Sequence, residues 1–424
     1  MPPPEPPPDP LPPLDTTFVR EQFPAFSEPS LADWAFFENA GGSYACRQVI
    51  DRLTTFYTKT KVQPYQPYPA SQAAAAAMEE SHVRLAAYLG VGDDEIHFGP
   101  STSQNTYVLA RALRPLWRDG DEIVVTDQDH EANSGAWRRL AETGIVVREW
   151  TIDPATGALD PAALADLLGD RTKLVALPHC SNVVAEVNPL AEISALAHAA
   201  GALVVADGVA YAPHGLPDVA ALGADVYLFS LYKTWGPHLG VMTVRRELLA
   251  AAANEGHFFN AGVPRKRLVP AGPDHAQVAA AAGVADYLDL VDARHFAAAA
   301  APAERGRRLA RLFQAHESGL LAPLLAWLRG RDDVRILGPD EPARRAPTVS
   351  LLPLRRGVAE VHRELTARRL MTGRGHFFAV RPLAAMGVAT DPGVLRLSLL
   401  HYTTRDDVER LIAGLEAALG RQRA

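Results

Sequence analysis

The sequence predicts an α/β protein with a large domain, built on a mostly parallel sheet, and a smaller α+β domain. From about Asp33 to Tyr287, short apolar runs alternate with longer segments of helical pattern, which is typical of strands joined by crossover helices. An acid and a lysine, Asp207 and Lys233, each follow such an apolar run. After Asp289 the composition changes to segments rich in alanine, leucine and arginine.

These features predict how the chain of 424 residues is organised. Residues 1–13 are mostly proline and predict a tail without a stable fold of its own. We expect residues 14–34 to pack on the small domain. The large domain is predicted to span residues 35–290, and the small domain residues 291–424.

The apolar runs of the large domain predict its strands, which are Ile123–Val125, Ile145–Trp150, Leu174–Leu177, Leu203–Ala206, Val226–Phe229 and Val241–Val244. Helical patterns lie between several of these runs, in Trp137–Ala141, Pro161–Leu168 and Leu190–Ala200. Strands and helices that alternate at this spacing indicate parallel crossovers.

The carboxyl-terminal part predicts a different arrangement. Arg294–Trp327 is expected to form one or two helices, with Pro302 marking a kink or a helix start. Val349–Leu352 and Val394–Leu399 are predicted strands, and Asp406–Leu419 has the pattern of an amphipathic helix.

Composition excludes several classes of function. The formal net charge of −7 disfavours a nucleic-acid or an anionic-membrane partner. No apolar run reaches the roughly 18 to 20 residues that span a bilayer. The two cysteines, Cys46 and Cys180, lie far apart and do not indicate a disulfide framework, so we expect a cytoplasmic protein.

Asp207 and Lys233 are the residues that indicate chemistry most directly. Each follows a predicted buried strand, and side chains at the carboxyl ends of parallel strands point into the ligand crevice. An acid and a lysine at that edge suit pyridoxal phosphate (PLP), which needs a lysine for its Schiff base and a carboxylate beside its ring nitrogen. Taken singly, Lys233 could be a surface lysine, and Asp207, with Gly208, a turn residue.

The segment Gly99–Asn105 places hydroxyl side chains between a predicted strand and a predicted helix. Ser101, Thr102 and Ser103 could bind a phosphate with their hydroxyls and the backbone N–H groups of the helix start. The simpler interpretation is a serine or threonine helix cap.

His130 follows the strand that ends near Val125, so we expect it at the same crevice, where an imidazole could stack on a cofactor ring. Asp129 and Glu131 beside it superficially resemble metal ligands. Adjacent positions do not share a helix face, however, and no other cluster has ligand spacing, so we expect no metal.

In order and spacing, the segments Ser181–Leu190, Leu196–His198, Asp207–Gly208 and Ser230–Lys233 resemble the class V aminotransferase family of fold-type I PLP-dependent enzymes. The resemblance is greatest to the cysteine desulfurase branch and runs from about Phe36 to Leu419. It implies a homodimer with active sites at the interface.

The resemblance also implies a role for each candidate residue. Lys233 holds PLP through the Schiff base, Asp207 pairs with the ring nitrogen, and His130 stacks on the ring. The phosphate is bound by Thr102, Ser103 and Ser230, together with Ser101 of the same turn. The substrate is bound by Asn182 and Arg396, which hold its carboxylate, and by His376.

The sequence departs from the desulfurase pattern at three positions. Phe378 stands about where the family has its nucleophilic cysteine, so a persulfide cannot form there. Ala210 replaces a glutamine that bonds the cofactor, and Tyr211 is one candidate to compensate. Pro273 replaces the threonine that a partner subunit offers to the phosphate, and His275 could substitute for it.

The expected function is cleavage of a bond at the β-carbon of a small amino acid, with a carbon–sulfur bond as the leading candidate. In this scheme the leaving group departs without a protein nucleophile. The alternatives are transamination, epimerisation at the α-carbon as in isopenicillin-epimerase-like relatives, and a protein that binds PLP without turnover.

Overall fold

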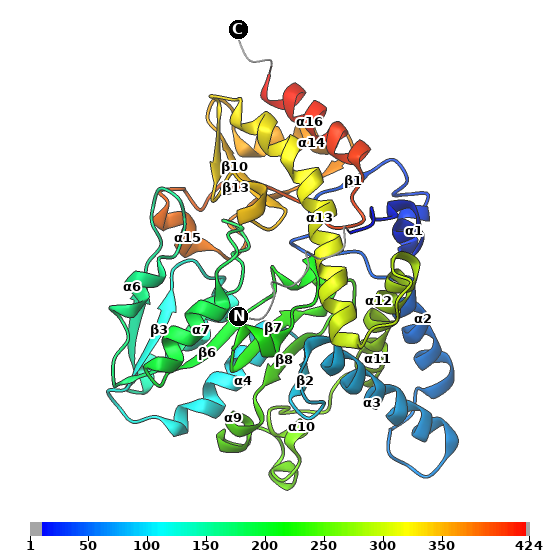
Figure 1. Cartoon of the computed structure of the whole chain (residues 1–424), viewed down its shortest axis with the longest axis vertical. Helices are drawn as coiled ribbons and strands as arrows, with labels where there is room; N and C mark the ends of the chain where they lie inside the picture. The colour runs from blue at the N-terminus through cyan, green and yellow to red at the C-terminus, as the bar shows by residue number, and fades with distance from the viewer. Residues whose placement is uncertain (1–10, 421–424) are drawn as a thin grey trace, which may run out of the picture.

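The computed structural model describes residues 11–420, so most of the predicted proline-rich tail, residues 1–13, lies outside the described residues. The main sheet has seven strands in the order β2-β8-β7-β6-β5-β3-β4 (Figure 1). All neighbouring pairs from β7 to β4 are parallel, whereas β8 runs antiparallel to both β7 and β2. The strands are β2 (Ile96–Gly99), β3 (Glu122–Thr126), β4 (Val146–Trp150), β5 (Thr172–Pro178), β6 (Leu203–Asp207), β7 (Val226–Ser230) and β8 (Gly240–Val244). This arrangement confirms the α/β class and the mostly parallel sheet.

Both faces of this sheet are covered, because alternate residues of its central strands β3, β5, β6 and β7 enter different hydrophobic clusters. In β7, Val226 and Leu228 pack with Leu109 and Trp137 of the neighbouring helices, whereas Tyr227 belongs to the cluster on the other face. The helices of this part of the chain are α2 (Arg47–Thr55), α3 (Pro69–Leu89), α4 (Thr102–Leu113), α5 (Glu131–Arg138), α6 (Pro161–Ala165), α7 (Leu190–Ala199), α8 (Val219–Leu222), α9 (Arg246–Ala251), α10 (Pro264–Arg267), α11 (His275–Ala280) and α12 (Ala282–His295).

The carboxyl-terminal part contains a second, antiparallel sheet in the order β12-β13-β10-β9. The short parallel pair of β1 and β11 brings residues near the amino end of the chain to this region. The elements here are β1 (Ala35–Phe36), β9 (Val334–Leu337), β10 (Thr348–Pro353), β11 (Leu370–Met371), β12 (Gly373–Gly375), β13 (Val394–Ser398), α14 (Val358–Ala367), α15 (Val380–Ala385) and α16 (Arg405–Leu419). Both predicted strands and the predicted closing helix are confirmed.

A single long helix, α13 (Pro302–Arg329), connects the two parts (Figure 1). Pro302 is its first residue rather than a kink, as expected for a residue without a backbone N–H. Leu312 and Phe313 pack in the cluster of the large sheet, whereas Leu324 and Leu328 pack in the cluster of the small sheet. The helix therefore holds the two sheets at a defined orientation.

The amino-terminal helix α1 (Thr16–Glu21) contacts both α12 and the carboxyl-terminal region. Arg20 Nη1 lies 2.9 Å from Asp407 Oδ2 of α16, and Arg294 Nη2 lies 2.7 Å from Asp15 Oδ2. The predicted domain boundaries and the packing of residues 14–34 on a small domain stay predictions. No helix within residues 11–420 is both long and apolar enough to span a bilayer.

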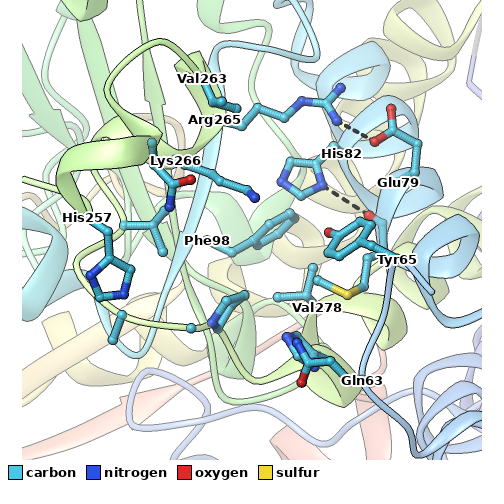
Figure 2. A pocket seen from close by; sticks show the side chains of 17 residues that line it. Gln63, Tyr65, Glu79, His82, Phe98, His257, Val263, Arg265, Lys266 and Val278 are labelled. Carbon is cyan, nitrogen blue, oxygen red and sulfur yellow. Dashed lines mark hydrogen bonds and ion pairs between the residues drawn. The ribbon is translucent and has the colours of Figure 1, made fainter. Parts of the chain in front are cut away.

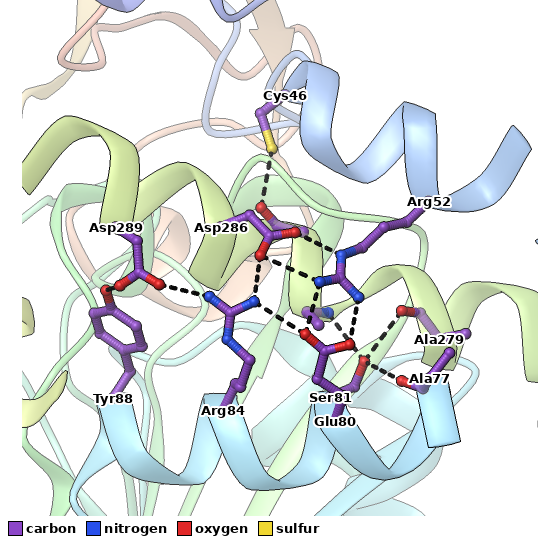
Figure 3. A network of polar contacts seen from close by, with 12 residues as sticks. Cys46, Arg52, Ala77, Glu80, Ser81, Arg84, Tyr88, Ala279, Asp286 and Asp289 are labelled. Atoms are coloured by element: carbon purple, nitrogen blue, oxygen red, sulfur yellow. Dashed lines mark hydrogen bonds and ion pairs between the residues drawn. The ribbon is translucent and has the colours of Figure 1, made fainter. Parts of the chain in front are cut away.

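A network of ion pairs joins α2, α3 and α12 (Figure 3). Arg52 Nη2 lies 2.8 Å from Glu80 Oε1, and Arg52 Nε lies 2.5 Å from Asp286 Oδ2. Arg84 contacts Asp286 as well, and its Nη2 lies 2.6 Å from Asp289 Oδ2. Because these side chains are partly exposed, the network orients the three helices more than it stabilises the fold.

A buried histidine in β2 makes the stability of the fold sensitive to acid. His97 is buried, and burial lowers its pKa from 6.5 to about 4. Between those values the unfolded chain binds a proton that the folded chain does not, so stability falls as the pH drops from 6.5 to 4. We expect His97→Leu to reduce the stability lost between pH 7 and pH 4 by about 3 kcal/mol.

Urea denaturation at several pH values measures this effect. His257→Leu is the control, because that histidine is exposed. Equal pH dependence in the wild type and His97→Leu would contradict the assignment.

Candidate active site

The carboxyl ends of β3, β6 and β7 open onto one cavity. Asp207 is the last residue of β6, Ser230 is the last residue of β7, and Lys233 lies in the helical turn that follows. His130 begins α5 after β3. The residues that line the cavity are Ser101, Thr102, Ser103, Asp129, His130, Ala132, Pro178, Cys180, Asn182, Asp207, Val209, Ala210, Ser230, Tyr232, Lys233 and His238.

Lys233 is only 9% exposed, so its amine lies inside the protein rather than in bulk solvent. Burial and the positive charge of Arg396 lower its pKa to about 8, and the carboxylates of Asp207 and Glu38 oppose this shift. A lysine in this state has a larger fraction of free amine near neutral pH, which is the form that condenses with an aldehyde.

Asp207 is buried on the same cavity. Its Oδ1 accepts a hydrogen bond from Val209 N at 2.8 Å. Burial raises the pKa of Asp207 to about 6, although the Val209 N–H and the charge of Lys233 lower it. A positively charged ring nitrogen beside this carboxylate would favour its ionised form.

His130 faces the cavity as a neutral imidazole. Burial, followed by the positive charges of Lys233 and Arg396, lowers its pKa to about 3. Its Nδ1 accepts a hydrogen bond from Ala132 N at 3.0 Å, which fixes the ring at the start of α5. A neutral, fixed imidazole suits stacking on an aromatic cofactor ring.

A turn rich in hydroxyl groups forms another wall of the cavity. Ser101 caps α4 by accepting a hydrogen bond from Gln104 N at 3.2 Å, so the simple capping role holds for this residue. Thr102 Oγ1 and Ser230 Oγ lie 2.7 Å apart. A Cβ at Gly240 would overlap backbone atoms of Ser101 and Thr102, so the turn lies directly against β8.

The two residues predicted to hold the substrate carboxylate lie close together. Arg396 of β13 is 2% exposed, and its Nη1 donates to Asn182 O at 3.3 Å. Its Nη2 lies 2.8 Å from Glu38 Oε1, and the Phe377 ring covers the guanidinium at 3.7 Å. Asn182 Nδ2 in turn donates to Phe377 O at 2.9 Å.

Three predicted site residues do not line this cavity. Arg396 lies behind the cavity wall, bonded to Asn182, whereas the two histidines lie elsewhere. His275 begins α11 and lines a separate cavity of about 410 Å³, shown in Figure 2, between the loops near Tyr65 and Arg265. His376 is exposed, and its Nδ1 accepts a hydrogen bond from Phe378 N at 3.1 Å. A single copy of the chain therefore does not bring either imidazole to Lys233, and their roles stay predictions.

Tyr211 does not compensate for Ala210 at the cavity. Its ring stacks on His179 with centroids 3.8 Å apart, and Gln314 donates to its hydroxyl at 3.3 Å. Only Ala210 of this pair lines the cavity that contains Lys233.

Sequence reasoning missed several residues near the cavity. Tyr232 stacks on His238 with centroids 4.7 Å apart, and both line the cavity. Glu38 directly follows the apolar segment Ala35–Phe37, the same signal that identified Asp207, and could have been found that way. Among residues 11–420, no group of three or more acidic, histidine or cysteine side chains could hold a metal ion.

The groups around the cavity fit PLP. A buried lysine, a buried carboxylate and a neutral imidazole surround one space, and the hydroxyl groups at the start of α4 provide donors for a phosphate. Arg396 Nε is buried and has no hydrogen-bond partner among the described residues, so it is a free donor for a substrate carboxylate, whereas Asn182 Oδ1, also without a partner, can only accept from a donor.

Comparison with known proteins identifies the family. Residues 35–411 match the model of the class-V aminotransferase family. The chain is 34% identical over 411 residues to the aminotransferase-like protein FGM3 of Gibberella zeae. This alignment covers 95% of this chain and 98% of that protein. It is 30% identical over 416 residues to a cysteine desulfurase of Serratia proteamaculans, in an alignment that covers 94% of this chain and 97% of the desulfurase.

A solved structure shares the fold. The apo structure of a cysteine desulfurase from Thermococcus onnurineus superimposes with a TM-score of 0.83 at 24% identity, covering 95% of this chain and 98% of that one. The family match and the fold agree with the groups around Lys233. The chain therefore belongs to the class-V aminotransferase family and is a PLP-dependent enzyme of fold type I, similar to cysteine desulfurases.

Proposed function

We propose that this enzyme cleaves a bond at the β-carbon of a small amino acid, with a carbon–sulfur bond as the leading candidate. The observation that supports this proposal is the shared cavity of Lys233, Asp207 and His130, with Asn182 on its wall and Arg396 bonded to Asn182.

Three residues would hold the cofactor ring. When bound, PLP supplies a ring that accepts electrons from the substrate α-carbon. Lys233 would attach the cofactor and, once released, take the proton from the α-carbon. Asp207 would keep the ring nitrogen protonated, and His130 would lie on the ring face.

The hydroxyl turn would hold the phosphate of the cofactor. Thr102, Ser103 and Ser230 would donate hydrogen bonds, and the start of α4, capped by Ser101, adds a favourable field for an anion. We assign His275 to the phosphate of a second copy of the chain, since in its own copy it lines a different cavity from Lys233.

The substrate carboxylate would bind Arg396 and Asn182. A guanidinium presents parallel N–H groups that match a carboxylate, and burial strengthens the interaction. His376 lies on the exposed loop that precedes α15, where a rearrangement of that loop would bring it to the substrate.

No protein thiolate is available to accept sulfur in this scheme. Phe378 stands in the loop beside His130, with ring centroids 5.4 Å apart, and it is 65% exposed. Burial raises the pKa of both Cys46 and Cys180 to about 12, so each stays a thiol at neutral pH. The leaving group would therefore depart directly from the β-carbon.

A panel of amino acids tests the proposed reaction. The purified enzyme with PLP would be incubated with L-cysteine, L-alanine and other small amino acids, and the products identified. A keto acid with sulfide or ammonia supports cleavage at the β-carbon. A keto acid with the amine form of the cofactor supports transamination, a racemised amino acid supports epimerisation, and no spectral change supports a non-catalytic PLP-binding protein.

The placement of Phe378 at the position of the desulfurase nucleophile predicts that a cysteine there would form a persulfide. If Phe378 occupies the position of the desulfurase nucleophile, Phe378→Cys should form a persulfide when the enzyme is given L-cysteine. Mass spectrometry of the intact protein would detect the added sulfur. Val380→Cys, on an exposed position two residues along, is the control. Absence of a persulfide on both variants would mean that the loop is placed differently.

We also propose that the protein is a cytoplasmic homodimer. Tyr65, which lines the cavity of Figure 2, is exposed, and so are Phe258 (87%) and Phe259, which lie in the chain between two other lining residues, His257 and Asn260. A second copy would cover these side chains and bring His275 to its cofactor. Both cysteines are buried free thiols, in keeping with a reducing compartment. Light scattering on the purified protein would test the dimer, and cell fractionation the location.

A further inference from the structure

The guanidinium of Arg396 already has an anionic partner within the chain. Glu38 Oε1 lies 2.8 Å from Arg396 Nη2, and the Glu38 side chain is 31% exposed whereas that of Arg396 is 3% exposed. The charges of both residues act on Lys233, in opposite directions. Glu38 is therefore a carboxylate at the edge of the active site, bound where a substrate carboxylate is expected.

The backbone around Glu38 leaves room for this carboxylate. Gly373 of β12 pairs directly with Arg396 of β13, and Glu38 forms a bridge with Ser398 two residues along the same strand. A Cβ at Gly41 would overlap the Glu38 carboxylate, and a Cβ at Gly373 would lie 2.9 Å from its Oε1. The position of Glu38 is thus built into the fold rather than the result of a free surface rotamer.

The other substrate-binding groups are also partly occupied by the chain. The Phe377 ring lies on one face of the Arg396 guanidinium, and Phe377 O accepts from Asn182 Nδ2. Arg396 Nε and Asn182 Oδ1 remain buried without a partner among the described residues. A substrate carboxylate can accept from Arg396 Nη2 and Asn182 Nδ2 only when the contacts of these donors with Glu38 and Phe377 O rearrange.

Of the contacts that Glu38 and Phe377 make with the substrate-binding groups, only that of Glu38 carries a negative charge. A buried guanidinium needs an anion, and Glu38 supplies it while the substrate is absent. A substrate carboxylate that binds the same guanidinium would lie next to a second negative charge, which disfavours both carboxylates together. The two carboxylates therefore compete for Arg396.

We propose that Glu38 is an affinity-determining residue whose carboxylate occupies the position on Arg396 that the substrate carboxylate takes, so that substrate binding requires Glu38 to move away. This inference rests on the proposed function, because it assigns the substrate carboxylate to Arg396. Glu38 weakens binding of every substrate with an α-carboxylate, and it selects against ligands that cannot displace it.

Glu38→Gln tests this inference, because glutamine keeps the shape and a hydrogen-bond acceptor but removes the charge. The PLP-loaded wild type and variant would be titrated with L-alanine, and the cofactor absorbance recorded. We expect L-alanine to bind the variant about five- to tenfold more tightly, since the competing state is removed. L-alanine methyl ester, which has no carboxylate charge, should bind both proteins equally.

A second readout does not depend on activity. Without ligand, Glu38→Gln should unfold at a lower temperature than the wild type, because Arg396 loses its anion, and saturating L-alanine should remove most of the difference. Glu131→Gln is the matched control, since Glu131 pairs with Arg381 near the same loop and does not contact Arg396. It should leave L-alanine affinity unchanged.

Glu38→Asp serves as a second variant if Glu38→Gln folds poorly. It keeps the charge but shortens the side chain, so L-alanine should bind more tightly than to the wild type. Equal or weaker L-alanine binding in the folded variants would overturn the inference and assign Glu38 a purely orienting role. A wild-type cofactor spectrum that ignores L-alanine would instead contradict the proposed function on which the inference rests.

Discussion

Lys233→Ala is expected to abolish turnover and the covalent attachment of PLP. Lys233 is buried, its pKa is lowered to about 8, and it shares its cavity with Asp207 and His130. Because the same amine would attach the cofactor and transfer the α-proton, its loss should lower kcat at least about 10³-fold. The measurements are kcat with the best substrate of the panel and the visible absorbance of the purified variant.

Lys173→Ala is the matched control for this change. Lys173 lies at the start of β5, on the part of the sheet away from the cavity, and its Nζ donates to Asp170 O at 3.0 Å. This control should retain both turnover and absorbance. Full turnover by Lys233→Ala would refute the assignment of the lysine.

Arg396→Lys should lower kcat/KM strongly and leave cofactor binding unchanged. Lysine keeps the charge but cannot donate in parallel to a carboxylate or stack on the Phe377 ring as a planar group. We expect kcat/KM to fall about 10²-fold, which corresponds to about 3 kcal/mol. Cofactor absorbance should be unchanged.

Arg374→Lys provides the comparison, because Arg374 lies on β12 next to β13 and is exposed. It should leave kcat/KM within about twofold of the wild type, as is usual for surface changes. If Arg396→Lys retained wild-type kcat/KM, the substrate carboxylate would have to bind elsewhere.

Most of the large sheet could be predicted from local pattern. The run Val226–Phe229 is apolar throughout, as a strand buried on both faces requires, and β7 forms there. The antiparallel direction of β8 was not predicted, because the run Val241–Val244 has the same composition as the parallel strands. The short connection 231–239 does indicate an antiparallel neighbour, since a parallel crossover needs about a dozen residues or more.

The site residues at or just after the carboxyl ends of parallel strands could be predicted from the sequence. Asp207, Lys233 and His130 meet because their strands are parallel and end at one edge of the sheet. The pairing of Glu38 with Arg396 could not be predicted, because it joins residues from opposite ends of the chain through β1, β11 and β13. Local pattern also does not show that His376 is on an exposed part of its loop.

The central claim is that PLP is bound covalently at Lys233, and reductive trapping tests it most directly. The PLP-loaded enzyme would be treated with borohydride, digested and examined by mass spectrometry. The pyridoxyl mass should be found on the peptide that contains Lys233. The chain's other lysines are Lys59, Lys61, Lys173 and Lys266. A stoichiometric label on one of these in the active enzyme, with Lys233 unmodified, would contradict the account.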